Sequence, residues 1–391
     1  MDLSRPVTPM RKLMGAGPLD IHPRVYKALA SPIIGHLDPS YLQSVNRIGD
    51  LLKPIFGTVN SATNAVPGTG TAGMECCIAN LTEPKDNVLI GIAGYFGDRL
   101  RQMAQRYGAN VSIVNASAGS PVDPSKIEKV LKSGKKYKYI ALVHAETSTG
   151  VLQPMDEIAE IARRYNTMLI LDVVTSLGGL KLTIDRWGID AAYACSQKCV
   201  GSPPGLSPVT FSDKAINMIK NRKTQVINWY LDINLLMQYW DAKAYHHTSP
   251  SVLNYALLEA LLLIHEEGLE QRFERHNQMH RALVVGLSGL GLKMLVEEPY
   301  RLPTLNTVVV PDGVNEAAVR KYLLDRYSIE ISAGLGELSG KVWRIGIMGY
   351  SASPQSILLL ITALNRALEV QGYKKADLAA ALSGATSEFD S

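Results

Sequence analysis

The sequence has few cysteines, little excess charge and no long hydrophobic run. Only four of its 391 residues are cysteine, which excludes a disulfide framework for a chain of this length and favours a reducing compartment. The formal net charge of +4 at pH 7 is too small to predict binding to nucleic acid or to a membrane surface. No segment reaches the length of a bilayer-spanning helix, and the first 25 residues lack the apolar stretch of a secretory signal. The composition therefore predicts a cytoplasmic protein.

The pattern of apolar residues predicts an α/β protein with more than one packed unit. A chain of 391 residues is longer than a typical domain. Short apolar runs alternate with helical patterns up to about residue 212, which is typical of a mainly parallel sheet. These runs lie at 87–92, 110–114, 139–144, 168–172, 191–195 and 208–212. Beyond residue 251 longer helical patterns with interspersed strands predict a smaller α+β domain.

Four segments are expected along the chain. An N-terminal arm over 1–22 precedes a large domain over 23–260 and a small C-terminal domain over 261–375. Residues 376–391 are mostly small or polar and predict a flexible tail. A cleft between the two domains is the expected place for a ligand.

A glycine-rich segment, GTGTAG at 68–73, fits the pattern GxGxxG of dinucleotide-binding folds. The residues before it make a poor strand, and no acidic residue closes a second strand about 20 positions later. A nicotinamide-dependent dehydrogenase therefore stays only as an alternative. Small residues and threonine hydroxyls at a helix start can also bind one phosphate. A glycine turn with a helix cap is the simplest structural interpretation.

His144 and Glu146 have the spacing of the H-x-E motif of zinc deaminases. The accompanying P-C-x-x-C pattern is missing, and Cys195 and Cys199 have no second pair of ligands near them in the sequence. The sequence therefore predicts no metal site.

The residues with the clearest chemical meaning are Asp172 and Lys198. Asp172 ends one apolar run, and Lys198 follows the next one, so both are expected at the carboxyl edge of the sheet and in one cleft. A lysine that forms a Schiff base and an aspartate at the pyridine nitrogen are the two fixed requirements of pyridoxal phosphate chemistry. An ordinary salt bridge at a strand end is the alternative.

Five segments of the chain resemble the class V, fold type I aminotransferases, and most closely the group that acts on alanine or serine with glyoxylate or pyruvate. They are LILDVVTSLGG, CSQKCVGSPPG, HAETSTGVLQP, AYHHT and GKVWRIGIMG. The likeness extends from about residue 12 to residue 370. It implies a large domain built on a mainly parallel seven-stranded sheet flanked by helices, a homodimer, and pyridoxal 5′-phosphate as cofactor.

The resemblance also implies what each site residue does. Lys198 would carry the cofactor and move a proton, while Asp172 would keep the ring nitrogen protonated. Arg344 would bind the substrate carboxylate, and Gly17 would belong to an arm that covers the substrate. The other implied contacts are Phe96 and Val174 at the ring, Thr147 at the ring or substrate, Thr69, Gly70, Thr71 and Gln197 at the phosphate, and Tyr245 and Thr248 from the partner subunit.

The expected activity is transfer of the amino group of alanine or serine to glyoxylate or pyruvate by a ping-pong cycle. The motifs hold one arginine for a carboxylate, Arg344, which favours small amino acids. Transaminases of 2-aminoethylphosphonate or 3-hydroxykynurenine are alternatives within the fold, and the first substrate offers Arg344 no carboxylate. A catalytically silent binding protein of the same fold is a further alternative.

Overall fold

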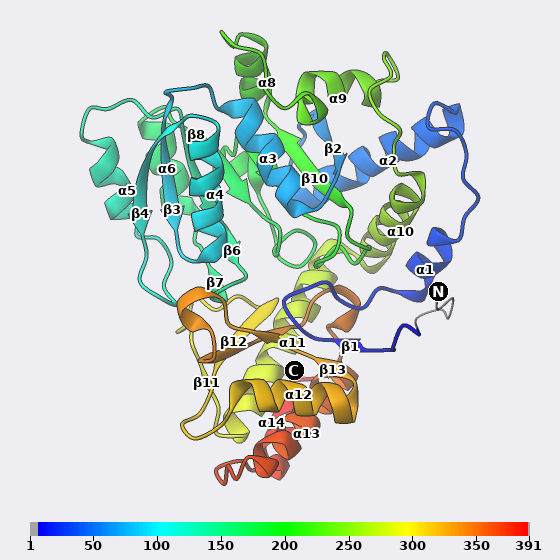
Figure 1. The fold of residues 1–391 in the computed structure, drawn as a ribbon, viewed down its shortest axis with the longest axis vertical. Coiled ribbons are helices and arrows are strands. Elements are labelled where there is room, and N and C mark those ends of the chain that lie inside the picture. The colour runs from blue at the N-terminus through cyan, green and yellow to red at the C-terminus, as the bar shows by residue number, and fades with distance from the viewer. Residues whose placement is uncertain (1–6, 390–391) are drawn as a thin grey trace, which may run out of the picture.

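The larger part of the molecule is a seven-stranded sheet with helices on both faces (Figure 1). The computed structural model describes residues 7–389. Across the sheet the order is β2 (Ala62–Pro67), β10 (Leu206–Phe211), β9 (Ala191–Tyr193), β8 (Met168–Asp172), β5 (Tyr139–Val143), β3 (Asn87–Ile92) and β4 (Asn110–Asn115). β10 is antiparallel to both of its neighbours, and the other adjacent pairs are parallel. The predicted strands and the mainly parallel sheet are confirmed.

β2 is a strand that the sequence pattern did not predict. Its six residues, ATNAVP, include an asparagine and a proline, which strands disfavour. They nevertheless pair with β10 along their whole length. The prediction of a poor strand before the glycine segment was therefore wrong, because pairing at the sheet edge outweighs a weak local preference.

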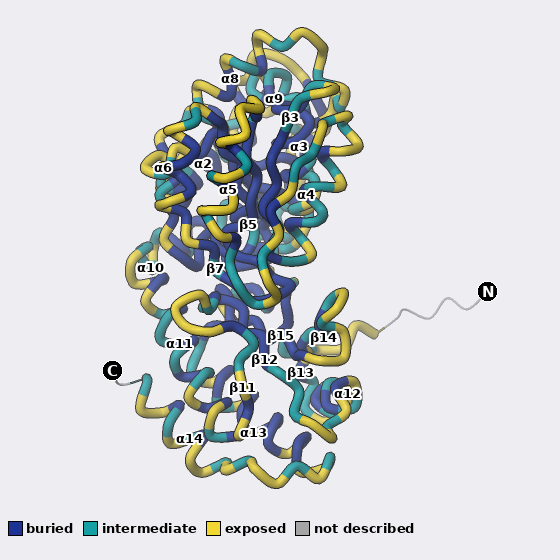
Figure 2. The backbone as a smooth tube through the Cα atoms, turned by 90° about the vertical axis from the view of Figure 1, so that its left-hand side faces the viewer, coloured by how far each residue is buried: buried dark blue, intermediate teal, exposed yellow. Residues whose placement is uncertain are grey.

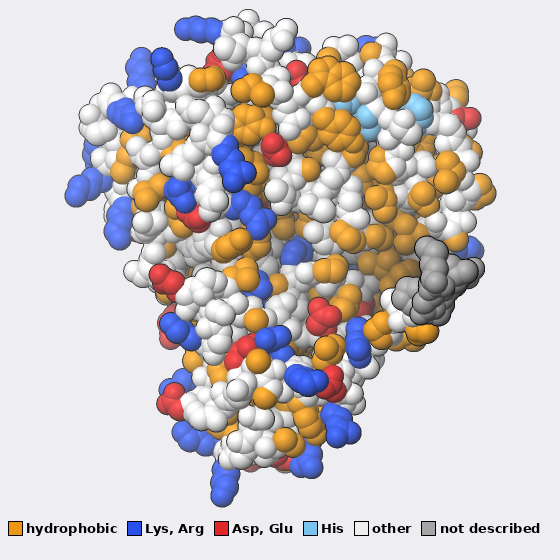
Figure 3. Space-filling view, in the orientation of Figure 1, with side chains coloured by type: hydrophobic (Ala, Val, Ile, Leu, Met, Phe, Trp, Pro, Cys, Tyr) orange, Lys and Arg blue, Asp and Glu red, His pale blue; other side chains and the backbone are white. Residues whose placement is uncertain are grey.

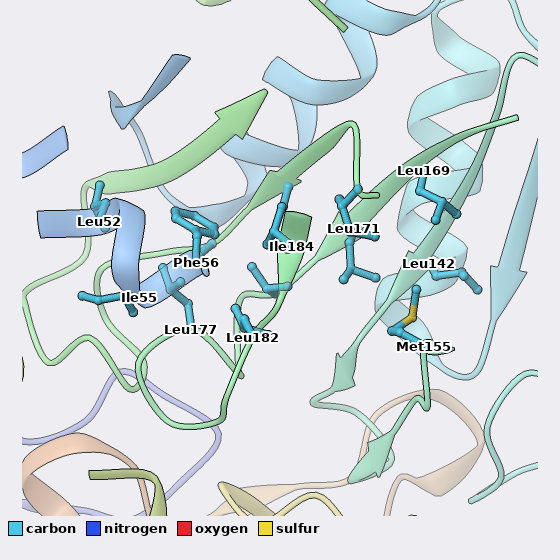
Figure 4. Packing of buried hydrophobic residues seen from close by; sticks show 14 of the residues in the cluster. Leu52, Ile55, Phe56, Leu142, Met155, Leu169, Leu171, Leu177, Leu182 and Ile184 are labelled. Carbon is cyan, nitrogen blue, oxygen red and sulfur yellow. The ribbon is translucent and has the colours of Figure 1, made fainter. Parts of the chain in front are cut away.

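Alternation along the strands separates two hydrophobic cores. Leu169 and Leu171 belong to the core under α2 (Pro39–Phe56), α6 (Asp156–Arg164) and α10 (Ser251–Glu267), part of which Figure 4 shows. Ile170 belongs to the opposite core under α3 (Gly70–Leu81), α4 (Tyr95–Arg106), α8 (Asp213–Lys220) and α9 (Ile233–Trp240). Since side chains two residues apart share a face, Asp172 points to the side of Ile170, toward α3 and α4. α5 (Pro124–Leu131) lies on the same face as α2, α6 and α10.

The C-terminal part is built on a smaller, antiparallel sheet. Its order is β11 (Lys293–Met294), β12 (Leu305–Val309), β15 (Val342–Gly346) and β14 (Ser332–Ala333). α12 (Glu316–Tyr327) and α13 (Pro354–Val370) pack with α11 (Leu269–Gly289) around one core.

The boundary expected at residue 260 falls inside α10, which continues to Glu267. The chain changes direction at Gly268, whose φ of +88° suits glycine.

The N-terminal arm is attached to the small sheet and its neighbours. β1 (Lys12–Leu13) pairs in parallel with β13 (Ile329–Glu330). The amide of Gly346 donates a hydrogen bond to the carbonyl of Met14 at 2.8 Å. Residues 1–6 of the expected arm lie outside the described residues.

The expected tail contains a packed helix, α14 (Leu378–Ser387). Asp377 caps it by accepting a hydrogen bond from the amide of Ala380, and Ala381 and Ala385 are fully buried. A Cβ added to Gly289 of α11 would lie 2.5 Å from the Cα of Ala381. The small residues that suggested a flexible tail are instead what allows two helices to approach closely. Residues 390–391 are outside the described residues.

Buried residues follow the strands and the inward faces of the helices in Figure 2. No helix within residues 7–389 is long and apolar enough to cross a bilayer. The remaining elements are short: α1 (Pro23–Leu29), β6 (Ala145–Glu146), β7 (Val151–Leu152), α7 (Ile184–Trp187), and 3-10 turns at Trp229–Leu231, Gly336–Leu338 and Gly349–Ser351.

Candidate active site

A cavity opens on the α3 and α4 side of the sheet, where β8 and β9 end. It encloses about 150 Å³. Its walls include these predicted site residues: Thr69, Gly70, Thr71, Phe96, Thr147, Asp172, Val174, Gln197 and Lys198. A larger hollow of about 560 Å³ lies on the small domain near Tyr373 and Lys374, and its lining contains none of them. The cavity beside Asp172 is therefore the candidate active site.

Asp172 presents a buried carboxylate to this cavity. Only 3% of the residue is exposed. Oδ2 accepts a hydrogen bond from the Tyr193 hydroxyl at 2.6 Å, and Oδ1 accepts one from the Val174 amide at 2.9 Å. Burial raises the pKa of Asp172 to about 7, although both hydrogen bonds act to lower it. A cation placed beside this carboxylate would lower the pKa again and keep the group ionised.

Lys198 reaches the same cavity from the turn after β9. It is 9% exposed, and its Nζ makes no hydrogen bond to any residue within 7–389. Burial lowers the pKa of the Lys198 amine, and the charge of Arg344 lowers it further. The environment thus favours the neutral amine, which is the form that attacks a carbonyl carbon.

The N-terminal arm lies directly against Lys198. A Cβ added to Gly17 would lie 2.7 Å from the Lys198 Nζ, and the φ of Gly17 is +97°. Both the contact and the backbone angle require glycine at this position. The arm therefore borders the amine, and its place over the substrate stays a prediction.

The N-terminus of α3 forms one end of the cavity. Thr69 is the N-cap residue, but its side chain accepts no capping hydrogen bond, and the first turn has no acidic residue. A Cβ on Gly70 would lie 3.1 Å from the Cβ of Cys195, so the backbone passes close to the cavity wall. Gln197 has a buried side-chain oxygen without a hydrogen-bond partner. Free helix amides are donors that suit a phosphate group, and the Gln197 side chain can add its NH2 group as a donor when its amide is turned toward the anion.

Phe96 is held at the cavity by a buried carboxylate that the sequence analysis did not assign. Glu146 accepts hydrogen bonds from the amides of Phe96 at 3.4 Å and Gly97 at 3.2 Å, and from the Ser148 hydroxyl at 2.5 Å. It thereby caps the start of α4, where Gly94 offers no side chain. His144 bonds to Ser176 instead.

Arg344 lies beside Thr147 in the middle of β15. Its Nε donates to the carbonyl of Ala333 at 2.7 Å, and its Nη1 donates to the carbonyl of Thr147 at 3.1 Å. These bonds orient the guanidinium, and Nη2 makes no hydrogen bond to any described residue. Burial lowers the pKa of Arg344, yet the group stays charged. Free donors on an oriented guanidinium suit a carboxylate.

Tyr245 and Thr248 do not line the cavity of their own chain. Tyr245 is 60% exposed and packs against the ring of His36, with 5.4 Å between centroids. Thr248 is also exposed. Their place in a partner's site stays a prediction.

Sequence reasoning missed several residues of the cavity wall. Tyr193 lies opposite Asp172 in the register of β8 and β9, and the alternation of β9 would have revealed it. Arg99 lies on α4 and offered no comparable signal, because its helix face looks solvent-exposed in the sequence. The other such residues are Met74, Val143 and Cys195.

Comparison with known proteins identifies the family. The model of the family described as aminotransferase class-V matches residues 45–350, more than half of the chain. The alanine–glyoxylate aminotransferase of Drosophila melanogaster is 40% identical over 94% of this chain and 95% of its own. The (S)-ureidoglycine–glyoxylate transaminase of Bacillus subtilis is 36% identical over 92% of this chain and 91% of its own.

A solved structure agrees in fold as well as in sequence. The alanine–glyoxylate aminotransferase of Nostoc sp. has 47% identity, a TM-score of 0.92, and matches covering 94% of this chain and 98% of that one. The cavity's amine, carboxylate and phosphate-type cradle fit the cofactor of such enzymes. The chain therefore belongs to the class V aminotransferases, fold type I enzymes that depend on pyridoxal 5′-phosphate.

Proposed function

We propose that this enzyme transfers the amino group of a small L-amino acid, alanine or serine, to glyoxylate or pyruvate by a ping-pong cycle. The observation that carries the proposal is a buried lysine amine that shares one cavity with a buried carboxylate and feels the charge of the Arg344 guanidinium, whose Nη2 makes no hydrogen bond to any described residue. The named relatives support glyoxylate as acceptor. Their named donors differ, alanine in one and ureidoglycine in the other.

Each residue of the cavity has a defined task in this proposal. Bound pyridoxal phosphate supplies a ring that accepts the electrons released when the substrate's Cα–H bond breaks. Lys198 holds the cofactor covalently and, after the substrate has taken its place, removes the proton from Cα. A lysine with a lowered pKa can do this near neutral pH. Asp172 keeps the proton on the ring nitrogen.

The remaining walls orient the cofactor and exclude water. Phe96 and Val174 supply the apolar surface for the ring, and Thr147 contacts the ring or the substrate. The phosphate is assigned to the α3 end of the cavity and to Gln197. This second set comprises Thr69, Gly70, Thr71 and Gln197.

Arg344 decides which substrates bind productively. Its free Nη2 donors would pair with the α-carboxylate, which alanine, serine and ureidoglycine carry and 2-aminoethylphosphonate lacks. Thr147 connects Arg344 with the cavity, because its carbonyl accepts a hydrogen bond from Arg344 and the residue belongs to the cavity wall.

A donor panel with an Arg344→Gln variant tests the proposal. Half-reactions are followed by the loss of the visible absorbance of the bound cofactor with alanine, serine, (S)-ureidoglycine, glutamate, 3-hydroxykynurenine and 2-aminoethylphosphonate. We expect the small carboxylate donors to react fastest, and Arg344→Gln to lower kcat/KM for them roughly 10- to 100-fold. Arg366→Gln, on the exposed side of α13, is the matched control. The proposal is contradicted if 2-aminoethylphosphonate reacts faster than the other donors, or if Arg344→Gln has the same kcat/KM as wild type for the small carboxylate donors.

The active enzyme is proposed to be a homodimer in which Tyr245 and Thr248 complete the partner's site. Both residues are exposed, and other large apolar side chains near them are exposed as well, among them Trp229 and Ile227. Hydrophobic side chains gather over α2, α9 and α10 in Figure 3. Such a patch supports an interface between copies of the chain.

Mixing two inactive variants tests the shared site. A Lys198→Ala subunit and a Tyr245→Ala, Thr248→Ala subunit each lack one part of the site. A hybrid dimer would contain one doubly damaged site and one intact site, so random mixing should restore about a quarter of the wild-type activity. Activity is measured after joint refolding, with each variant alone as control. No recovery in hybrids confirmed by mass would show that each chain builds its site alone.

A further inference from the structure

Arg99 places a second positive charge at the cavity, and no task has yet been assigned to it. Its Nη1 donates a hydrogen bond to the Thr71 hydroxyl at 3.2 Å, which connects α4 to the first turn of α3. The Arg99 Cζ lies 5.0 Å from the ring centroid of Phe96 and 5.2 Å from that of Tyr95. Hydrogen bond and cation–π contacts together hold the guanidinium at the α3 end of the cavity.

The Arg99 guanidinium forms no ion pair with any acidic residue in the described part of the chain. Of the described residues that line the cavity, Arg99 and Lys198 are the basic ones and Asp172 is the acidic one. Arg99 has no carboxylate partner among residues 7–389. The nearest acidic neighbour in sequence, Asp98, is occupied by Arg101 and Gln102. The Arg99 side chain, of intermediate burial with an exposed guanidinium, therefore has no counter-ion within residues 7–389.

The helix that Arg99 faces makes this lack more costly. α3 directs its N-terminus, the positive end of its dipole, to the same end of the cavity, and its first turn contains no acid. Two positive groups repel each other unless an anion lies between them. Backbone amides, the Thr71 hydroxyl and a guanidinium that can donate two parallel hydrogen bonds form a strong oxyanion site.

We propose that Arg99 binds the phosphate group of pyridoxal phosphate and supplies the charge that its neutral ligands lack. This inference rests on the proposed cofactor site and deepens it. Thr69, Gly70, Thr71 and Gln197 contribute only neutral donors, whereas the phosphate carries nearly two negative charges at neutral pH. Thr69 and Thr71 are exposed in the single chain, and a phosphate held there gains from a charge-assisted bond to a cation. Arg99 is the basic residue already bonded to this cradle.

The test compares two ligands that differ only in the phosphate. Equilibrium dissociation constants for pyridoxal phosphate and for pyridoxal are measured by absorbance on cofactor-free wild type, Arg99→Gln and Arg99→Lys. Arg99→Gln should weaken pyridoxal phosphate binding roughly 10- to 100-fold and change pyridoxal binding by less than about threefold. Arg99→Lys should restore part of the loss, because it keeps the charge and loses the two-pronged geometry. Inorganic phosphate should compete less well with pyridoxal phosphate in Arg99→Gln.

A neighbouring arginine provides the control. Arg101 lies on the same helix, but it pairs with Asp98 and Gln105 and does not line the cavity. Arg101→Gln should leave both dissociation constants unchanged. Circular dichroism and thermal unfolding of each variant separate loss of binding from loss of fold, and Arg99→Lys carries the test if Arg99→Gln does not fold.

Three outcomes overturn the inference. Equal weakening of both ligands would show that Arg99 acts on the ring through Phe96. Unchanged binding of pyridoxal phosphate with a raised KM for the amino acid would assign Arg99 to the substrate. A wild type that binds pyridoxal as tightly as its phosphate ester would show that no phosphate site exists. In each case the half-reaction of wild type with alanine or serine tests the proposed function separately: if it proceeds, the proposed function stands although the inference on Arg99 fails, and if it does not, the proposed function fails as well.

Discussion

Replacing Lys198 by alanine should remove both turnover and the covalent attachment of the cofactor. Among the described residues that line the cavity, Lys198 is the one with a side-chain amine, and burial lowers the pKa of that amine. Burial raises the pKa of the other candidate, the Cys195 thiol, to about 12, so that group stays protonated. We expect kcat to fall roughly 10⁴-fold or more.

Reduction with borohydride followed by mass spectrometry measures the attachment directly. Wild type should gain the mass of the cofactor on the peptide that contains Lys198, and Lys198→Ala should gain none. Lys181, which is exposed and paired with Glu270, provides the control substitution Lys181→Ala. Substantial turnover by Lys198→Ala, or labelling of another lysine in wild type, would exclude the assigned role.

Replacing Asp172 by asparagine should have opposite effects on activity and on the stability of the cofactor-free protein. With cofactor bound, the variant loses the charge that keeps the ring nitrogen protonated, and kcat should fall roughly 10²- to 10³-fold. The visible spectrum of the bound cofactor should shift, while the covalent attachment to Lys198 remains. A variant with wild-type kcat would contradict the role of Asp172.

Without cofactor the same substitution should stabilise the protein at high pH. Burial raises the pKa of Asp172 to about 7 in the folded state, above its value in the unfolded chain. Stability from such a group is fully present below the unfolded pKa and is lost as the pH rises through the folded pKa. Relative to Asp172→Asn, wild type should therefore lose about 2 to 3 kcal/mol of unfolding free energy between pH 5 and pH 8.

Denaturant unfolding of both proteins at the two pH values measures this difference. Asp190→Asn is the control substitution. Burial also raises the pKa of Asp190, but this residue lies near Lys214 and outside the cavity. Loading with cofactor should abolish the advantage of Asp172→Asn, since a cation then faces the carboxylate. A stability difference that does not change with pH would show that Asp172 is already ionised in the cofactor-free protein.

The sequence predicted the parts of this structure that follow from local periodicity. α13 spans Pro354–Val370 as predicted, since Ser353 caps it, Pro354 begins it and apolar residues recur at helical spacing. β8 and β9 were predicted from short apolar runs, and their parallel pairing brings Asp172 to the sheet edge. Lys198 follows the next strand, so their shared cavity follows from topology.

The parts that were missed depend on contacts between distant segments. β2 forms because β10 offers it an edge, and α14 forms because Gly289 leaves room for it. Arg99 and Thr71 are 28 residues apart, on different helices, and their local patterns do not say which faces meet. The positions of Tyr245 and Thr248 in a partner's site stay predictions, because they depend on contacts with a second chain.

The attachment of the arm to the small sheet has a mechanical consequence. The same few residues of chain bond to Gly346 at one point and touch Lys198 at another, and Arg344 lies two residues before that glycine. The arm thus connects the small sheet, through Met14 and Gly346, with the amine of Lys198 in the large domain. Any displacement of the small sheet relative to the large one would therefore carry the arm and Arg344 along together.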